Sequence, residues 1–341
     1  MRLGRQVFDV LYREDMRSNT IPRLGRDVSA IGLGCWQLGA DWGDVGDDTA
    51  AAILDAAYDA GVTFFDTADV YGDGRSERAV GGLRAKHPEV TVATKIGRRA
   101  QPLVAEAFTL DAFRSWTDRS RENLGVDTLD LVQLHCPPAA VLSDPSTYDS
   151  LATLVDEGRI ARWGVSVETV AEAQEALRHD GLASIQIIIN LFRRKPLEFV
   201  TKAAADAGVG IIARVPLASG LLSGKYDETT QFAANDHRNY NRHGEAFDVG
   251  ETFSGVPYEV GVAAAREVAE LTPVGWTTAQ LALGWLTQQP GISTVIPGAR
   301  TPEQVHSNAA SAELPTIDAA LEEALAGIYS RNIEEHVHGR W

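Results

Sequence analysis

The feature that most constrains the fold of this 341-residue chain is a regular alternation of short apolar runs with longer helical patterns. Several of the short runs are almost wholly apolar, as in VTFF, TLDLVQL and SIQIII. Such runs are typical of parallel strands that are buried on both faces. The candidate strands follow one another along the chain at 29–33, 62–65, 90–94, 129–134, 160–165, 184–189, 210–214 and 294–296.

Helical patterns separate these candidate strands. The segment DDTAAAILDAAYDAG begins with carboxylates that can cap a helix and ends at Gly61, and the later intervals behave alike. Strands that are each followed by a helix through mostly short loops predict an α/β fold, a closed (β/α)8 or TIM barrel. The alternative is a doubly wound open sheet, which normally carries a G-x-G-x-x-G fingerprint after its first strand. The corresponding GLGCWQLG lacks that spacing.

Two stretches depart from the alternation. The segment TIPRLGRDVSAIGLG predicts an N-terminal β-hairpin that turns at 24–26, ahead of the first barrel strand. Residues 226–255, between the seventh and eighth strands, form a polar loop long enough to be a lid, a binding loop or a disordered segment. One helical run is expected from 258 to 288. We therefore expect an N-terminal extension over 1–20, a single barrel domain over 21–329 and a solvated tail over 330–341.

Composition limits the partners of the chain. A formal net charge of −16 disfavours binding to nucleic-acid phosphates and anionic lipid surfaces. No apolar run approaches the roughly 18 residues of a membrane-spanning helix, and the first 15 residues lack a secretory pattern. Two cysteines, Cys35 and Cys136, offer no disulfide framework. We expect a cytoplasmic protein, and the sequence leaves open whether it forms a homo-oligomer.

Polar residues of four types lie at the ends of three consecutive candidate strands. Asp66 directly follows VTFF and precedes Tyr71, Lys95 follows TVAT, and His135 follows LDLVQL. The active site of a (β/α)8 barrel lies at the carboxyl ends of its strands, so these side chains are expected to converge. Each has an ordinary alternative as a helix cap, a turn residue, a surface lysine or a core histidine. Their convergence at neighbouring strand ends favours an active site.

At this point the chain resembles the aldo-keto reductase family, in a bacterial branch related to the potassium-channel β-subunits. The resemblance rests on GVTFFDTADVYGDGRSERAVG at 61–81, VATKIG at 92–97 and DLVQLHCP at 130–137. It continues in GRIARWGVSVE at 158–168, IQIIINLF at 185–192, VPLASGLLSGKY at 215–226 and VIPGARTPEQVHSNAA at 295–310. The resemblance covers nearly the whole chain, from about residue 23 to residue 316.

The resemblance implies that Asp66, Tyr71, Lys95 and His135 are the family's catalytic tetrad. In that assignment Tyr71 donates a proton to a substrate carbonyl while a nicotinamide delivers hydride to carbon. Lys95, held charged by Asp66, is expected to lower the pKa of Tyr71. His135 is expected to bind the same carbonyl oxygen. The implied activity is the NADP(H)-dependent reduction of an aldehyde or ketone to an alcohol.

The resemblance also implies a site for NADPH. Ser166 and Gln186 would bind the carboxamide, and Arg214 would stack on the nicotinamide ring. Many relatives carry Lys and Arg where this chain has Gly298 and Gln304. Because this chain lacks those two cations, Arg300 would be the residue that binds the 2′-phosphate. The 226–255 loop would fold over the cofactor or be disordered. The implied cofactor-binding residues are Gly34, Trp36, Asp66, Ser166, Gln186, Arg214, Val215, Pro216, Leu217, Ser219, Gly220, Leu222, Lys225, Ile296, Gly298, Ala299, Arg300, Gln304 and Asn308.

The substrate is expected to be a small-molecule carbonyl compound that contacts Trp36, Tyr71 and His135. Fold alone does not determine which compound it is. One alternative hypothesis is an NADP(H)-binding sensor or regulatory subunit with little turnover. Another is an unrelated barrel such as a metal-dependent isomerase. The latter requires a carboxylate and histidine ligand cluster, and because none is evident in the sequence we expect no metal.

Overall fold

The computed structural model describes residues 16–39 and 45–341. Its main sheet has eight parallel strands in the order β10-β9-β8-β7-β6-β5-β4-β3. Isolated bridges pair Ile31 with Val295 and Gly34 with Gly298, which brings the first and last strands together. The predicted (β/α)8 barrel is therefore confirmed. The strands are β3 (Leu33–Gly34), β4 (Phe64–Asp66), β5 (Thr91–Ile96), β6 (Leu129–His135), β7 (Ile160–Ser166), β8 (Leu182–Ile188), β9 (Gly210–Arg214) and β10 (Ile292–Val295).

The prediction that residues 29–33 form the first barrel strand is wrong. Ser29 ends β2 (Arg26–Ser29), which pairs antiparallel with β1 (Ser18–Ile21), and the barrel strand β3 contains only Leu33 and Gly34, preceded by the isolated bridge at Ile31. Most other predicted strands end one or two residues too early, because the backbone ladder continues through the polar residues that follow each apolar run. Thus β4 includes Asp66 and β6 includes His135.

The strand register brings polar residues level at one end of the barrel. Asp66 pairs with Gly34, His135 pairs with Ser166, and Ser166 pairs with Gln186. Because all these strands are parallel, their carboxyl ends share one rim. The fold thus assembles side chains that are more than a hundred residues apart in the sequence.

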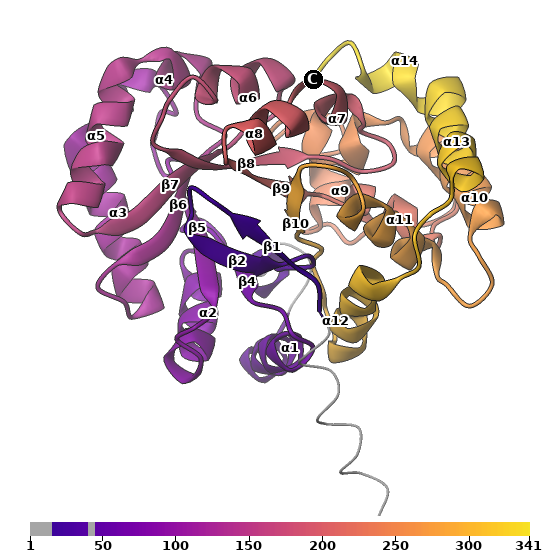
Figure 1. Ribbon diagram of the computed structural model, residues 1–341, viewed down its shortest axis with the longest axis horizontal. Helices are drawn as coiled ribbons and strands as arrows, with labels where there is room; N and C mark the ends of the chain where they lie inside the picture. The colour runs from indigo at the N-terminus through magenta and orange to yellow at the C-terminus, as the bar shows by residue number, and fades with distance from the viewer. Residues whose placement is uncertain (1–15, 40–44) are drawn as a thin grey trace, which may run out of the picture.

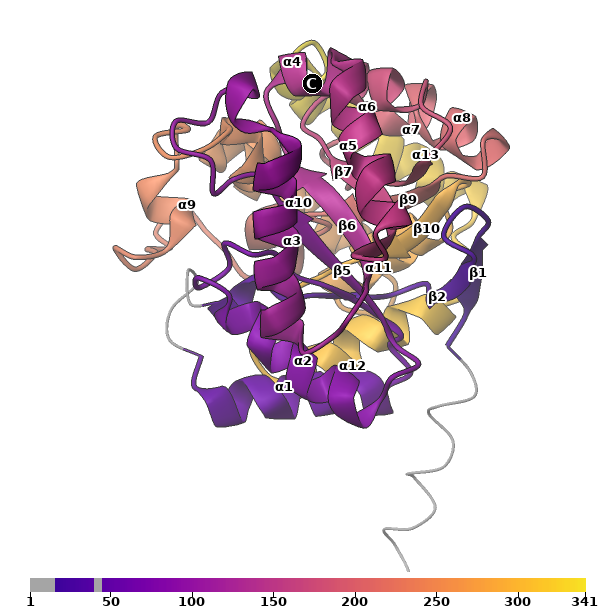
Figure 2. The ribbon, with the colours of Figure 1, turned by 90° about the vertical axis from the view of Figure 1, so that its left-hand side faces the viewer.

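Two apolar clusters fill the structure. The larger lies between the strands and the helices, and the smaller joins the β1–β2 hairpin to the inside of the barrel. The smaller cluster contains Ile21, Leu24, Val28, Phe64, Ala93, Leu131, Ala183, Ile212 and Ile296. Figure 2 shows the hairpin on the right and α9 (His237–Tyr240) on the left, at opposite ends of the molecule. The predicted hairpin is confirmed, and it covers the end of the barrel that lies away from the rim.

The helices surround the barrel (Figure 1). They are α1 (Asp47–Asp59), α2 (Arg75–Lys86), α3 (Leu110–Leu124), α4 (Ala139–Ser143), α5 (Pro145–Asp156), α6 (Val170–Ala176), α7 (Lys195–Phe199), α8 (Thr201–Asp206), α9, α10 (Tyr258–Leu271), α11 (Thr278–Thr287), α12 (Pro302–Ala309), α13 (Ala319–Ile328) and α14 (Glu334–Val337). The single helical run expected over 258–288 is wrong. It divides into α10 and α11, because Pro273 and the left-handed Gly275 interrupt it and Thr277 starts α11 with a capping box.

The 226–255 loop is structured. It contains α9 and the short 3₁₀ turns Val249–Glu251 and Phe253–Gly255. Phe253, Ser254 and Gly255 all have left-handed backbone angles, with φ of 53°, 58° and 77°. The loop thus has a defined path beside the barrel rim.

The two ends of the chain differ from expectation. Residues 1–15 of the predicted extension lie outside the described residues, and β1 shows that Ser18 to Thr20 belong to the hairpin. The expected solvated tail at 330–341 is wrong, because Ile333, Val337 and Trp341 are buried in the larger apolar cluster. Within the described part of the chain, no helix has both the length and the apolar character needed to cross a membrane.

Candidate active site

A cavity of about 570 Å³ lies at the carboxyl ends of the barrel strands. Most residues predicted for the site line it: Gly34, Trp36, Asp66, Tyr71, His135, Ser166, Gln186, Arg214, Val215, Pro216, Leu217, Ser219, Gly220, Lys225, Ile296, Gly298, Ala299, Arg300, Gln304 and Asn308. Two predicted residues do not. Lys95 lies behind Tyr71, and Leu222 is fully buried in the larger apolar cluster because the 3₁₀ turn Ala218–Ser223 directs it inward.

Lys95 connects the carboxylate of Asp66 to the phenol of Tyr71. Its Nζ donates to Asp66 Oδ2 at 2.5 Å and to the carbonyl oxygen of Thr67 at 2.9 Å. The same Nζ lies 3.3 Å from Tyr71 Oη. Asp66 and Lys95 are both buried, so little water competes with these contacts. The three side chains form one continuous hydrogen-bonded chain that ends at the cavity.

The electrostatics of this chain qualify one expectation. Burial raises the pKa of Tyr71, and the neighbouring Lys95 opposes this effect without reversing it. Burial alone would lower the pKa of Lys95, but Asp66 and Tyr71 raise it above its usual value. The expected lowering effect of Lys95 on the Tyr71 pKa is therefore present, but desolvation of the phenolate outweighs it, so the pKa is raised overall.

His135 lies beside Tyr71 and also lines the cavity. Its ring is perpendicular to the Tyr71 ring at a centroid distance of 5.9 Å. Burial lowers the pKa of His135 well below its ordinary value, and the cations Arg98, Lys95 and Arg214 lower it further. Among the described residues its Nδ1 has no hydrogen-bond partner. His135 is therefore a neutral imidazole at physiological pH.

Asp66 is also held from the opposite side. Gln186 Nε2 donates to Asp66 Oδ1 at 2.7 Å, and Gln133 Nε2 does so at 3.3 Å. Gln186, expected at the carboxamide of a cofactor, thus also orients the carboxylate. Gln133 has no place in the predicted site, although its position two residues before His135 on β6 was a usable signal.

Arg214, at the end of β9, is fixed by two carboxylates. Its guanidinium donates to Glu251 at 2.5 Å, to Glu168 at 2.9 Å and to the carbonyl oxygen of Val167 at 3.1 Å. Arg98 lies beside the same carboxylates, 3.6 Å from Glu168 and 3.7 Å from Glu251. We call Arg98, Glu168, Arg214 and Glu251 the arginine–glutamate cluster. It limits how Arg214 can orient toward a ring in the cavity.

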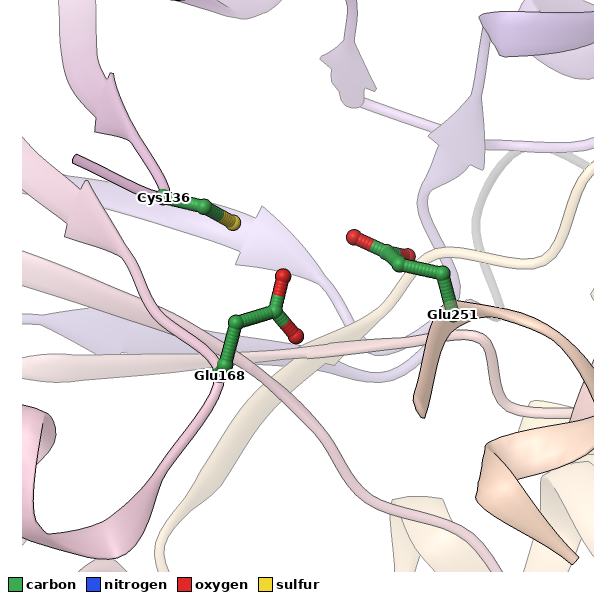
Figure 3. A group of neighbouring side chains, drawn as sticks. All are labelled: Cys136, Glu168 and Glu251. Carbon is green, nitrogen blue, oxygen red and sulfur yellow. The ribbon is translucent and has the colours of Figure 1, made fainter. Parts of the chain in front are cut away.

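The side chains of Cys136, Glu168 and Glu251 point toward a common centre (Figure 3). Their ligand atoms lie within 4.8 Å of one another, a grouping that could hold a metal ion. Arg98 and Arg214 already balance the two carboxylates, so we interpret the group as part of the arginine–glutamate cluster. Burial and Glu168 raise the pKa of Cys136 to about 12, which keeps its thiol protonated.

The side chain of Gln37 lies against Gly298. A Cβ added at Gly298 would lie 2.0 Å from Gln37 Nε2 and 2.3 Å from its Oε1. The Gln37 amide therefore occupies the space of a side chain at 298. Its Oε1 is buried without a hydrogen-bond partner among the described residues, and Gln37 lines the cavity. Gln304, for its part, accepts from the backbone N–H of Arg300 at 2.7 Å.

The 226–255 loop supplies one side of the cavity. Tyr226, Arg238, Tyr240, Phe247 and Glu251 all line it. Trp36 links this side to the barrel. Its ring is stacked on the Tyr71 ring with a centroid distance of 5.9 Å and lies edge-on to the Phe247 ring with a centroid distance of 6.0 Å. Individual positions in this loop could not be predicted as cavity residues, because the loop has no periodicity. Trp36, predicted at the substrate mouth, is half-buried there.

Comparison with known proteins agrees with this geometry. The model of the Aldo/keto reductase family matches residues 30–327. The chain is 30% identical to aldo-keto reductase YhdN of Bacillus subtilis, over 86% of this chain and 87% of that one. It is 28% identical to a probable voltage-gated potassium channel subunit beta of Arabidopsis thaliana, over 86% and 90%.

A solved structure gives the same result. An aldo-keto reductase from Klebsiella pneumoniae in complex with NADPH superposes with a TM-score of 0.67 at 26% identity, covering 92% of this chain and 96% of that one. Family model, relatives and solved structure agree over nearly the same span. The chain belongs to the aldo/keto reductase family.

Proposed function

We propose that this protein reduces an aldehyde or ketone to an alcohol with NADPH, and that Tyr71 is the general acid. The observation that carries the proposal is the chain of contacts from Asp66 through Lys95 to Tyr71, which ends at the cavity. A general acid needs a proton to give, a nearby charge that stabilises its anion, and access to the substrate. Tyr71 meets all three requirements.

The mechanism follows from the protonation states. The raised pKa of Tyr71 keeps its phenol protonated at neutral pH. NADPH, when bound, would supply hydride for the carbonyl carbon. Tyr71 would give its proton to the carbonyl oxygen, so that an alcohol forms. The phenolate left behind lies beside the Lys95 ammonium, which Asp66 holds charged. Lys95 thus acts by stabilising the anion as it forms.

His135 is proposed to orient the carbonyl group. A neutral imidazole has one N–H, which can donate to the carbonyl oxygen and stabilise the negative charge that develops there. A charged imidazolium would compete with Tyr71 as the acid. The lowered pKa of His135 keeps its ring neutral at neutral pH, so His135 does not compete with Tyr71 as the acid. In the reverse direction the same groups would oxidise an alcohol, with Tyr71 accepting the proton.

The residues present fit NADPH. Ser219 and Gly220 line the cavity with left-handed backbone, and Lys225 and Arg300 bring positive charge to it. Helix α12 begins beside Arg300 with Thr301 as its N-cap, and a helix N-terminus favours phosphate. We propose Ser166 and Gln186 as contacts of the carboxamide, and Arg300 as the contact of the 2′-phosphate. The Klebsiella relative in complex with NADPH supports the choice of cofactor.

The decisive test is Tyr71→Phe. We expect carbonyl reduction to fall at least about 100-fold, because the proton donor is lost, while the Kd for NADPH measured by fluorescence stays within about 3-fold. Tyr58→Phe is the matched control, since it removes a phenolic hydroxyl that donates to Glu89 outside the cavity. Near-normal reduction by Tyr71→Phe would remove Tyr71 from the mechanism.

A second candidate function is a cofactor-binding sensor, which the Arabidopsis relative described as a potassium channel subunit favours. The two functions make different predictions for the wild-type protein. A reductase oxidises NADPH when offered a panel of aldehydes and ketones. A sensor binds NADPH tightly with negligible turnover across the whole panel, and that result would replace our proposal.

A further inference from the structure

Trp341 lies against the 226–255 loop, outside the site described so far. Its indole is 6% exposed, and its Nε1 donates to Asp248 Oδ1 at 3.1 Å. The guanidinium carbon of the buried Arg193 lies 3.8 Å from the centre of the Trp341 ring, in cation–π geometry. One aromatic side chain therefore contacts both the barrel loop after β8 and the 226–255 loop.

The 226–255 loop fits closely around this indole. A Cβ at Gly255 would lie 2.3 Å from Trp341 Cη2, and one at Gly250 would lie 3.0 Å from Trp341 Cε2. Gly255 also has φ of +77°, so glycine is required there for two reasons. The path of residues 248–255 thus depends on the presence of the indole.

The same stretch has an unfavourable backbone conformation. Phe253 and Ser254 are left-handed without being glycine, a conformation that persists only where the surroundings hold it. Arg193 Nη2 donates to the carbonyl oxygen of Ser254 at 3.0 Å, and Asn190 Nδ2 donates to Ser254 Oγ at 2.7 Å. Trp341 in turn stacks on Arg193. These contacts stabilise the left-handed conformation of Phe253 and Ser254.

Residues 248–255 reach the cavity through Glu251. Its carboxylate accepts from Arg214 at 2.5 Å, and its carbonyl oxygen accepts from Ser219 Oγ at 3.0 Å. Ser219 Oγ also accepts from the backbone N–H of Phe253 at 3.1 Å. Arg214 and Ser219 both line the cavity. A shift of residues 248–255 would therefore move two of the groups proposed to contact the cofactor.

We propose that Trp341 and Arg193 are positioning residues that hold residues 248–255 in place and thereby set how long NADPH stays bound. The inference rests on the proposed function, since it concerns the same cofactor. Neither residue lines the cavity, so both act through Glu251 and Ser219. Without the indole, the left-handed stretch would relax, and the contacts of Glu251 with Arg214 and Ser219 would open more often.

The test is the rate of NADPH dissociation from the full chain, measured by stopped-flow fluorescence. We expect Trp341→Ala to raise this rate at least 10-fold. Trp341→Phe keeps an aromatic ring on Arg193 but lacks the N–H donated to Asp248, so we expect a rise of about 3-fold. Trp116→Ala is the matched control, because Trp116 packs on Phe108 and Phe113 away from the cavity. Its dissociation rate should equal that of the wild type.

Hydrogen–deuterium exchange gives a second readout that needs no cofactor. Exchange within 248–255 should rise in Trp341→Ala and stay unchanged in Trp116→Ala. An unchanged dissociation rate in folded Trp341→Ala, or an equal rise in Trp116→Ala, overturns the inference. If Trp341→Ala does not fold, an unchanged rate and unchanged exchange in Trp341→Phe overturn it. If wild-type protein binds no NADPH, the proposed function fails, and unchanged exchange in the Trp341 variants would then overturn the positioning role separately.

Discussion

Two groups of buried charges face the same cavity, and they are built differently. Asp66 and Lys95 come from adjacent strands β4 and β5, whose register brings their side chains together. The arginine–glutamate cluster joins Arg214 at the end of β9 to Glu168 after β7 and to Glu251 in the 226–255 loop. The first group depends on the barrel alone. The second also depends on where a long loop lies.

This difference suggests a division of roles, in which the first group serves proton transfer and the second group holds the loop beside the cavity. The first group acts on Tyr71, which we propose as the proton donor, and its parts are fixed by the strand ladder. The second group ties a loop to the barrel through ion pairs in which Arg214 and Glu251 are buried and Glu168 is partly buried. Because removing one partner of a buried ion pair leaves the other charge without compensation, the cluster stabilises the position of the loop beside the barrel. Three variants sharpen this comparison.

The largest effect is expected from Lys95→Met. Without the ammonium, the Tyr71 phenolate forms in a buried site with no counter-charge, so carbonyl reduction should fall about 1,000-fold. The Kd for NADPH should change by less than about 3-fold, which steady-state kinetics and fluorescence titration together can establish. Lys202→Met is the control, since Lys202 is exposed and paired with Asp206 on α8. If Lys95→Met kept activity within about 10-fold of the wild type, the proposed role of the Asp66–Lys95 group in proton transfer would be wrong.

A smaller effect, on stability, is expected from Arg214→Met. It leaves Glu168 and Glu251 buried with only the more distant Arg98, so the free energy of unfolding should fall by about 3 kcal/mol in urea titrations. The double variant Arg214→Met/Glu251→Gln should recover part of this loss. Arg266→Met, which breaks an exposed pair with Glu228, should cost less than about 1 kcal/mol. If Arg214→Met and Arg266→Met lower the free energy of unfolding by the same amount, the arginine–glutamate cluster has no special role in stability.

The smallest effect is expected from Asp69→Asn, a buried carboxyl that belongs to neither group. Neither carboxylate oxygen of Asp69 has a hydrogen-bond partner among the described residues. Burial and the nearby Glu77 raise its pKa from 3.8 to about 7. Between these values the folded protein binds a proton that the unfolded chain does not, so wild-type stability falls as pH rises through this window.

Asparagine cannot ionise, so the variant should lack this fall. We expect its unfolding free energy, relative to the wild type, to gain about 2 kcal/mol between pH 5 and pH 8 in urea titrations. Asp111→Asn is the control, because Asp111 is exposed in the first turn of α3. A parallel pH dependence of Asp69→Asn and the wild type would show that folding does not raise the pKa of Asp69.

The same comparison explains how far the sequence could predict the site. Asp66, Lys95 and His135 follow apolar strands directly, and parallel strands in a closed barrel bring such residues to one rim. Local pattern was therefore enough for them. Glu251 and Phe247 lie in a loop without periodicity, and their positions depend on contacts with distant residues such as Trp341 and Trp36.

Energetic balance was harder to predict than placement. The sequence correctly predicted that Lys95 lies beside Tyr71 and lowers its pKa, but it did not predict that burial raises this pKa by more, because burial is a property of the whole fold. The tail at 330–341 was misjudged for a related reason. Its apolar residues Ile333, Val337 and Trp341 are spaced four apart, but a single short helix does not reveal which surface it meets.

The β1–β2 hairpin has a consequence for the order of events at the cavity. With its apolar cluster it seals the far end of the barrel, so a molecule cannot pass through the described structure from end to end. NADPH and a carbonyl compound would enter and depart through the same opening. Because both would use one opening, a molecule bound near it would have to leave before one bound deeper could pass, which predicts ordered rather than random kinetics.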